Sequence, residues 1–273
     1  MLRGKINNSK MDIKLLNKDK TKLSFVAEGI DNVFANTLRR ISLVEVPVMA
    51  VSEVNFLKNN CALYDEIIAH RLGLIPLTTD LDSYNMPEDC KCKGNGCASC
   101  QTVLTLDTKG PCTVYASDLT AKDPAIKPVY PKMPIVILLK NQGLKLEATA
   151  RLGRGKEHTK FSPCHIYYKS YPDIKVEKDL KNSESVEKIC PTHVFSLESG
   201  KLKIKDELAC ILCNACTDIS DPKSSLTVNP SENKFIFFLE SWGQLEPKRI
   251  MQEALKIFDS KLDDFSKSLK KIK

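Results

Sequence analysis

The chain has 273 residues, of which 42% are apolar, and its 41 basic and 34 acidic side chains give a net charge of +7. This composition is that of a globular protein of about two domains, and it excludes a disordered tail, a collagen and a coiled coil. Apolar runs such as Ile135–Leu139 are much shorter than the ~18 residues that span a membrane, and no apolar signal segment stands at the start. We therefore expect a soluble, cytoplasmic protein.

The N-terminal segment is predicted to form two strands and a helix. Residues 11–16 alternate in polarity, and residues 22–27 are rich in apolar and β-branched side chains. Asp31 or Asn32 can cap a helix that Pro47 then ends. The helix carries an apolar stripe flanked by two arginines: Phe34, Leu38, Ile41 and Val44, with Arg39 and Arg40. This stripe packs either on the chain's own sheet or on a helix of a partner protein.

The middle of the chain is predicted to be rich in β-structure. Residues 144–152 alternate between apolar and polar side chains, which is typical of a strand with one buried face. Shorter strand candidates are residues 101–107, 112–116, 135–139 and 165–168. Between residues 170 and 220 the composition shifts to Lys, Glu and Ser around cysteines. This shift predicts a small module that a metal holds together.

The C-terminal segment again places a strand before a helix. Residues 234–240 form an apolar strand, and Pro247 suits the first turn of a helix of about 20 residues, or ~30 Å. The helix has one apolar stripe, open to the same two interpretations: Met251, Leu255, Phe258, Leu262 and Phe265. The first and last segments are predicted to form one domain that inserted material interrupts, which makes the fold α+β.

Cysteine is the unusual residue type, because 11 cysteines occur without a secretory segment. Such a chain favours metal sites or buried thiols over disulfide bonds. Four cysteines lie within Cys90–Cys100 and three within Cys210–Cys216, which predicts two metal sites. Cys61, Cys112 and Cys164 stand alone and are predicted to be small buried hydrophobes. The histidines lack metal spacing and are expected in the core or on the surface: His70, His158, His165 and His193.

The first cysteine group predicts a closed zinc site. Its four thiols can surround one tetrahedral ion: Cys90, Cys92, Cys97 and Cys100. Gly94 and Gly96 allow the positive φ angles that let both halves of the loop face the metal. A four-thiolate site leaves no open position for water, so we expect a structural Zn²⁺. An iron–sulfur centre or free thiols remain the alternatives.

The second cysteine group predicts one iron–sulfur cluster. Cys210, Cys213 and Cys216 have the spacing that surrounds three corners of a 4Fe-4S cubane, and Cys190 before Pro191 supplies the fourth ligand. The positions of a second cluster's ligands hold Leu180, Ser183, Val186 and Ser220. A 3Fe-4S form, or zinc in the same pocket, is the alternative.

The sequence contains no recognisable active site. The basic segment Gly153–Lys160 lacks the ending of a P-loop and the glycine triplet of a dinucleotide site, and is predicted to be a mobile, solvated loop. No zinc-protease helix, nucleophile elbow or kinase signature occurs. We therefore predict no catalytic residues in this chain.

Three segments together resemble the signature of RNA polymerase subunits of the α type: residues 32–40, 46–50 and 66–77. The resemblance extends through the cysteine loop at residues 90–100 to the terminal helix. The inserted ferredoxin-like module points to the archaeal D branch of this family, with the eukaryotic third-largest subunits as nearer cousins than the bacterial chain.

The resemblance implies a fold and a division into domains. A discontinuous dimerisation domain, an antiparallel sheet plus two helices, comprises residues 1–46 and 223–273. An inserted β-rich domain comprises residues 47–169 and carries the zinc loop, and a small ferredoxin-like domain comprises residues 170–222. The subunit itself is non-catalytic, although the whole polymerase is a nucleotidyltransferase.

The resemblance also implies partners. The two helices pair with the small L subunit (Rpo11), and the pair, with subunits N (Rpo10) and P (Rpo12), forms the platform on which the two large subunits settle. The implied interface residues are Phe34, Leu38, Arg39, Arg40, Ile41, Met251, Leu255, Phe258, Leu262 and Phe265. Arg39, Arg40 and the segment Gly153–Lys160 face the larger partners, the second-largest subunit especially. We expect neither a nucleotide nor a membrane to contact the chain.

Two other classes of protein are weighed against this one. An iron–sulfur electron-transfer protein is disfavoured because no flavin, nicotinamide or second-cluster site is present to pass electrons on. A zinc-dependent nucleic-acid binder is disfavoured because residues 90–100 contain two lysines and no aromatic residue. The cluster's plainest role is structural, and a redox sensor that tunes assembly is the alternative hypothesis.

Overall fold

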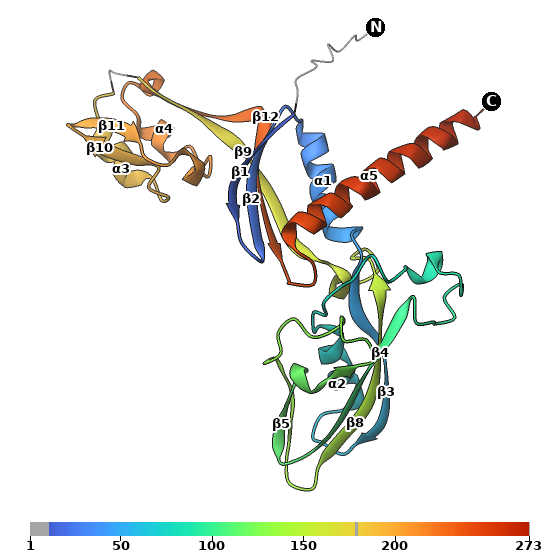
Figure 1. The fold of residues 1–273 in the computed structure, drawn as a ribbon. Coiled ribbons are helices and arrows are strands. Elements are labelled where there is room, and N and C mark those ends of the chain that lie inside the picture. Colours follow the sequence, from blue (N-terminus) through green and yellow to red (C-terminus); the bar gives the residue numbers. More distant parts are fainter. Residues whose placement is uncertain (1–10, 178–179, 273) are drawn as a thin grey trace. The chain divides into compact units, whose positions relative to one another are not determined.

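The computed structural model describes residues 11–177 and 180–272, and the backbone divides into two compact units. One unit comprises the residues up to Asn17, Ser24–Asn36 and Tyr167–Phe238. The other comprises Lys18–Leu23, Thr37–Ile166 and the residues from Leu239 onward. Each unit is therefore built from segments that lie far apart in the sequence, as the colours of Figure 1 show.

Four strands form the first sheet, in the order β1 (Asp12–Lys18), β2 (Lys22–Glu28), β12 (Leu226–Ser241) and β9 (Cys164–Val176). The two N-terminal strands confirm the prediction for residues 11–28. β9 and β12 have 13 and 16 residues and are much longer than their predicted cores. Phe25 stacks on Phe237 with ring centroids 5.1 Å apart, so aromatic side chains from both ends of the chain pack together.

Two helices carry the predicted apolar stripes. α1 (Asn32–Val44) begins where expected, because the Asp31 carboxylate accepts a hydrogen bond from the backbone N–H of Phe34 at 2.7 Å. α5 (Pro247–Lys270) has 24 residues and is longer than predicted. The Ser42 hydroxyl lies 3.7 Å from the Met251 sulfur, so the C-terminal part of α1 packs beside the start of α5 (Figure 1).

A second, antiparallel sheet has the order β3 (Val48–Asn59), β8 (Gly143–Gly153), β4 (Gln101–Lys109) and β6 (Thr120–Ala121). The predicted alternation is confirmed, because every second residue of β8 is buried: Leu144, Leu146, Ala148, Ala150 and Leu152. The short strands β5 (Cys112–Tyr115) and β7 (Pro134–Leu138) pair with each other. α2 (Asp65–Gly73) contributes Ile68 and Leu72 to the same core.

A small segment between β9 and β12 has its own core. It contains α3 (Ser183–Ile189), a hairpin of β10 (Phe195–Glu198) and β11 (Lys201–Ile204), and α4 (Ala215–Ile219). Its core includes Val186, Val194, Phe195 and Leu202 together with three cysteines. The remaining short 3-10 turns of the chain are Pro87–Asp89, Ala116–Asp118, Thr159–Phe161, Glu207–Ala209 and Lys223–Ser225. The mixture of helices and antiparallel sheets makes the fold α+β, as expected.

The prediction that Gly153–Lys160 is a mobile, solvated loop is wrong for the ends of the segment. A Cβ atom on Gly155 would lie 2.6 Å from the carbonyl oxygen of Leu43, so only glycine allows this approach. The Lys160 amine donates to the carbonyl of Val51 at 2.9 Å, beside the fully buried Phe161. Only residues 156–159 at the tip are exposed. The segment was predicted to be solvated because it is rich in charged residues, and its sequence alone does not show these contacts.

The solitary cysteines differ from one another in burial. Cys164 is buried as predicted, and burial raises the pKa of its thiol to about 12. Cys61 and Cys112 are half-buried and pack against the core of the second sheet, so they are less buried than predicted. All four histidines are exposed. Within the part of the chain that the structure describes, no helix is both long and apolar enough to cross a membrane.

Candidate metal centres

The first cysteine loop connects a 3-10 turn to strand β4. Cys90 follows Pro87–Asp89, and Cys100 stands directly before the first residue of β4. Gly94 and Gly96 have φ angles of 83° and 82°, which confirms that the loop uses glycine to turn back on itself. The loop therefore connects a short turn at one end to a strand of the second sheet at the other.

The four thiols of this loop surround a common centre. All four sulfur atoms lie within 4.8 Å of one another. Cys92 Sγ is 3.4 Å from Cys90 Sγ and 3.6 Å from Cys100 Sγ, and Cys97 Sγ is 3.8 Å from Cys100 Sγ. A tetrahedral ion with metal–sulfur bonds of ~2.3 Å separates its sulfurs by about 3.8 Å. The group therefore has the dimensions of a shell around a single metal ion.

The pKa values of two of these thiols are shifted in opposite directions. The hydrogen bond between the Cys90 and Cys92 thiols holds the pKa of Cys92 at about 6, whereas burial raises the pKa of Cys100 to about 12. The backbone N–H of Cys97 points at Cys100 Sγ from 3.3 Å, a donor that favours the thiolate once a cation is present. Because metals bind the thiolate form, a metal at this site would displace the protons that the thiols carry.

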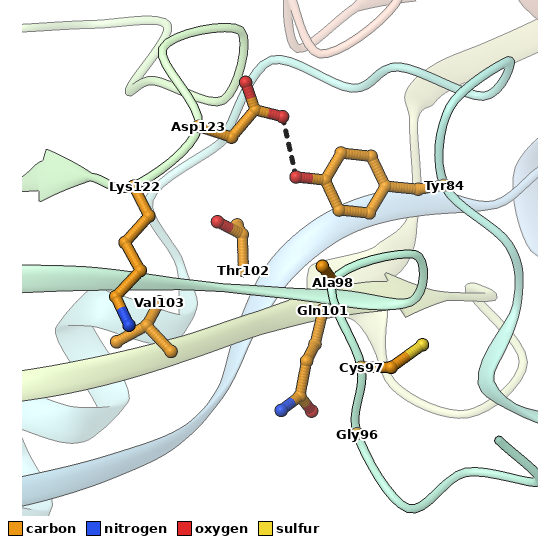
Figure 2. A pocket seen from close by; sticks show the side chains of 9 residues that line it. All are labelled: Tyr84, Gly96, Cys97, Ala98, Gln101, Thr102, Val103, Lys122 and Asp123. Atoms are coloured by element: carbon orange, nitrogen blue, oxygen red, sulfur yellow. Dashed lines mark hydrogen bonds between the residues drawn. The ribbon is translucent and has the colours of Figure 1, made fainter.

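An open cavity of about 490 Å³ lies beside the loop (Figure 2). Its wall includes Cys97, Gln101 and Lys122, and on the opposite side the Tyr84 hydroxyl donates to the Asp123 carboxylate at 2.7 Å. Burial, and to a lesser extent the hydrogen bond to Asp123, raise the pKa of Tyr84 to about 12. The phenol therefore stays protonated and keeps donating to the Asp123 carboxylate.

The second cysteine group is divided by burial. Cys190, Cys210 and Cys216 are buried in one core cluster, while Cys213 is exposed. Burial, and then the nearby thiols of Cys210 and Cys190, raise the pKa of Cys216, which is consistent with their proximity. The flanking Leu212 and Asn214 have φ angles of 57° and 59°, so the backbone turns sharply on both sides of Cys213.

Backbone donors point at two of these sulfurs. The N–H of Val194 lies 3.4 Å from Cys190 Sγ, and the N–H of Leu212 lies 3.5 Å from Cys210 Sγ. Such N–H···S hydrogen bonds stabilise thiolates and help to set the reduction potential of iron–sulfur clusters. The structure therefore brings Cys190, Cys210 and Cys216 into one buried cluster and leaves Cys213 exposed.

The residues of the expected partner interface fall into three groups. Leu38, Ile41 and Met251 are buried within the chain itself. Phe34, Arg39 and Phe258 are half-buried. The exposed group comprises Arg40, Leu255, Leu262 and Phe265.

The exposed part of the α5 stripe continues beyond Phe265, the last residue of the predicted stripe. Leu262 and Phe265 are 50% and 63% exposed, and Leu269, one turn further, is 50% exposed. Leu269 continues the three- and four-residue spacing, so extending the stripe in the sequence could have found it. By contrast, Ile250 and Ala254 at the start of α5 are fully buried. α5 therefore packs on the chain with its first turns and projects with its last ones (Figure 1).

Comparisons with known proteins agree with one another. Residues 40–163 match the model of the RNA polymerase Rpb3/RpoA insert domain. The chain is 40% identical over 265 residues to DNA-directed RNA polymerase subunit Rpo3 of Methanosphaera stadtmanae, covering 93% of this chain and 97% of the relative. It is also 40% identical over 257 residues to the subunit of the same name from Methanothermobacter thermautotrophicus, with the same coverage.

A third relative widens the range of sources. DNA-directed RNA polymerase subunit Rpo3 of Archaeoglobus fulgidus is 35% identical over 262 residues, which span 96% of this chain and 98% of the relative. All three names denote a subunit of a transcription enzyme, and none denotes an electron carrier. The matches cover 93–96% of this chain and 97–98% of the relatives, so the chain belongs to the family of DNA-directed RNA polymerase subunit Rpo3.

Proposed function

We propose that the chain is a non-catalytic assembly subunit of a DNA-directed RNA polymerase and works in the cytoplasm. The observation that carries this proposal is the similarity over 93% of the chain to relatives that bear the subunit's name. Catalysis by the polymerase is therefore assigned to other subunits.

The exposed part of α5 is the proposed surface for the L subunit. Burying Leu262, Phe265 and Leu269 against a partner helix would stabilise a complex by about 25 cal/mol for each Å² of apolar surface removed from water. Contiguous exposed apolar side chains on one helix face are typical of a protein interface. We assign the N, P and two large subunits to the other surfaces of the chain, with Arg40 toward the larger partners.

We propose that the first cysteine group binds one Zn²⁺. Four thiols with the spacing of a tetrahedral shell suit zinc, whereas the thiolates of a cubane bind four different irons and lie further apart. The ion would join the turn before Cys90 to strand β4 and so brace the inserted domain, proposed at residues 47–169. A closed shell of this kind contributes folding energy and no chemistry.

We propose that the second group binds one 4Fe-4S cluster through Cys190, Cys210, Cys213 and Cys216. The shared core of three of these residues and the N–H donors at two of their sulfurs support the assignment. A 3Fe-4S form needs one thiolate fewer, and the exposed Cys213 is the ligand that it would lack. The cluster would hold the ferredoxin-like domain, proposed at residues 170–222, between the two parts of the dimerisation domain at residues 1–46 and 223–273.

An α5 variant tests the assembly role. In Leu262→Glu with Phe265→Glu, two charges replace the exposed stripe, and we expect loss of the small partner from pull-downs of the full chain. Ser260→Glu is the matched control, because Ser260 is exposed on the opposite side of the same helix. Equal recovery of the small partner with both variants would contradict the proposed interface.

A further inference from the structure

Strand β9 reaches the turn that carries the first cysteine of the Cys210–Cys216 motif. The Lys169 amine donates hydrogen bonds to the carbonyl oxygens of Leu208 at 2.6 Å and of Cys210 at 2.8 Å. The same amine lies 5.8 Å from the centre of the Phe238 ring on strand β12. These two charge-assisted hydrogen bonds hold the backbone on both sides of Ala209, where the cysteine motif begins.

Tyr171 strengthens this attachment from the same face of the strand. It lies two residues after Lys169, and its hydroxyl donates to the Glu207 carboxylate at 2.7 Å. The amine of Lys234 lies 4.1 Å from the centre of the Tyr171 ring. The turn is also fixed internally, because the Asp206 carboxylate accepts from the backbone N–H of Leu208 at 3.0 Å.

We propose that Lys169 is a positioning residue for the iron–sulfur cluster. This inference rests on the proposed cluster ligands and adds a residue outside the cysteine motif. Lys169 keeps Cys210 in the buried group with Cys190 and Cys216, and it places a positive charge beside that group. Four thiolates carry more negative charge than the iron–sulfur core carries positive charge, so a nearby ammonium favours both retention of the cluster and its reduction.

Three variants of the full chain distinguish the effect of the Lys169 charge from the effect of the hydrogen bonds that hold the turn at Cys210. Lys169→Met removes the ammonium and keeps the length of the stem, and Lys169→Arg keeps the charge. Tyr171→Phe removes only the hydroxyl that binds Glu207. Lys175→Met is the control, because Lys175 is exposed on the same strand and pairs only loosely with Asp173 at 3.8 Å. Each protein is purified without oxygen and assayed for zinc, iron, sulfide, iron loss to a chelator and reduction potential.

The variants have distinct expected results. Lys169→Met loses iron about tenfold faster than the wild type, as typical for a lost outer-shell partner, and its potential becomes more negative. Lys169→Arg restores the potential, and Tyr171→Phe speeds the loss of iron without moving the potential. Zinc content stays unchanged in all variants. Tyr171→Phe and Lys169→Arg carry the test if circular dichroism shows that Lys169→Met does not fold.

Two results would overturn the inference in different ways. A wild-type chain that holds zinc but takes up no iron or sulfide refutes the proposed cluster and this inference with it. A wild-type chain with a cluster, whose iron loss and potential are the same in Lys169→Met and Lys175→Met, refutes the role of Lys169 alone.

Discussion

The carboxylate of Glu45 lies 3.0 Å from the amine of Lys261 and so joins the residue after α1 to the middle of α5. A second amine, that of Lys156 in the loop after β8, lies 3.4 Å from the other carboxylate oxygen. Glu45 is mostly buried, whereas both lysines are about half exposed. One acidic side chain therefore links three segments that are distant in the sequence.

This arrangement predicts a stability that depends on pH. Burial raises the pKa of Glu45, but the hydrogen bond and charge of Lys261, with those of Lys156, outweigh it and hold the pKa below its ordinary value of 4.5. The contribution is fully present above that value and is lost as the pH falls through the lower, folded-state pKa. We expect Glu45→Gln to lower the free energy of unfolding at pH 7 by about 1 kcal/mol or less.

Urea unfolding of wild type and Glu45→Gln at pH 7 and at pH 3 measures this contribution. The difference between the two proteins should shrink at the lower pH. Asp264→Asn is the control, because its pair with Lys267 at 3.3 Å is exposed on both sides and should contribute almost nothing. A difference that is the same at both pH values would contradict the ionic role of Glu45.

Replacing Cys97 tests the first metal centre. Cys97→Ser should remove the metal, because it breaks a shell whose four sulfurs lie within 4.8 Å of one another. We expect the zinc content to fall from about one ion per chain to none, with a lower melting temperature and an unchanged iron content. Cys112→Ser, at a half-buried thiol outside both groups, should keep the zinc. Zinc retention in Cys97→Ser would exclude the assignment.

Adding a methyl group at Gly155 tests the corrected view of the loop after β8. The new Cβ atom would lie 2.6 Å from the Leu43 carbonyl oxygen, so Gly155→Ala should lower the free energy of unfolding by about 1–3 kcal/mol. Gly73→Ala is the matched control, because its Cβ atom would come no closer than 3.7 Å to its surroundings. Equal stability of the two variants, measured by urea unfolding, would contradict the close packing of Gly155 against Leu43.

Local signals in the sequence predict most of this structure. The cap at Asp31, the alternation in β8 and the first cysteine loop each depend on residues within a few positions of one another, and physical rules apply directly. Strand β3 escaped prediction because its first four residues, Val48–Val51, are all buried and show no alternation, and only the residues after them alternate. Helix α2 begins without a side-chain cap, and only the acidic residues Asp65 and Glu66 in its first turn mark its start.

The contacts that join distant segments could not be predicted. Lys169 and Cys210 are 41 residues apart, and nothing in the composition around Lys169 separates it from the exposed Lys175. Glu45 and Lys261 are 216 residues apart. Likewise, the stripe on α5 indicates an apolar face, but only the packing of Ile250 and Ala254 shows where burial by the chain ends. Such pairings follow from the tertiary fold and not from local propensity.

The most direct test of the assembly role is native mass spectrometry of the complex that the N-terminally tagged chain recovers from its own cells, purified without oxygen at high salt. The proposal predicts one copy of the chain with one small partner and both large polymerase subunits. A chain recovered alone, or in complex with a reductase, would contradict the assembly role and favour electron transfer.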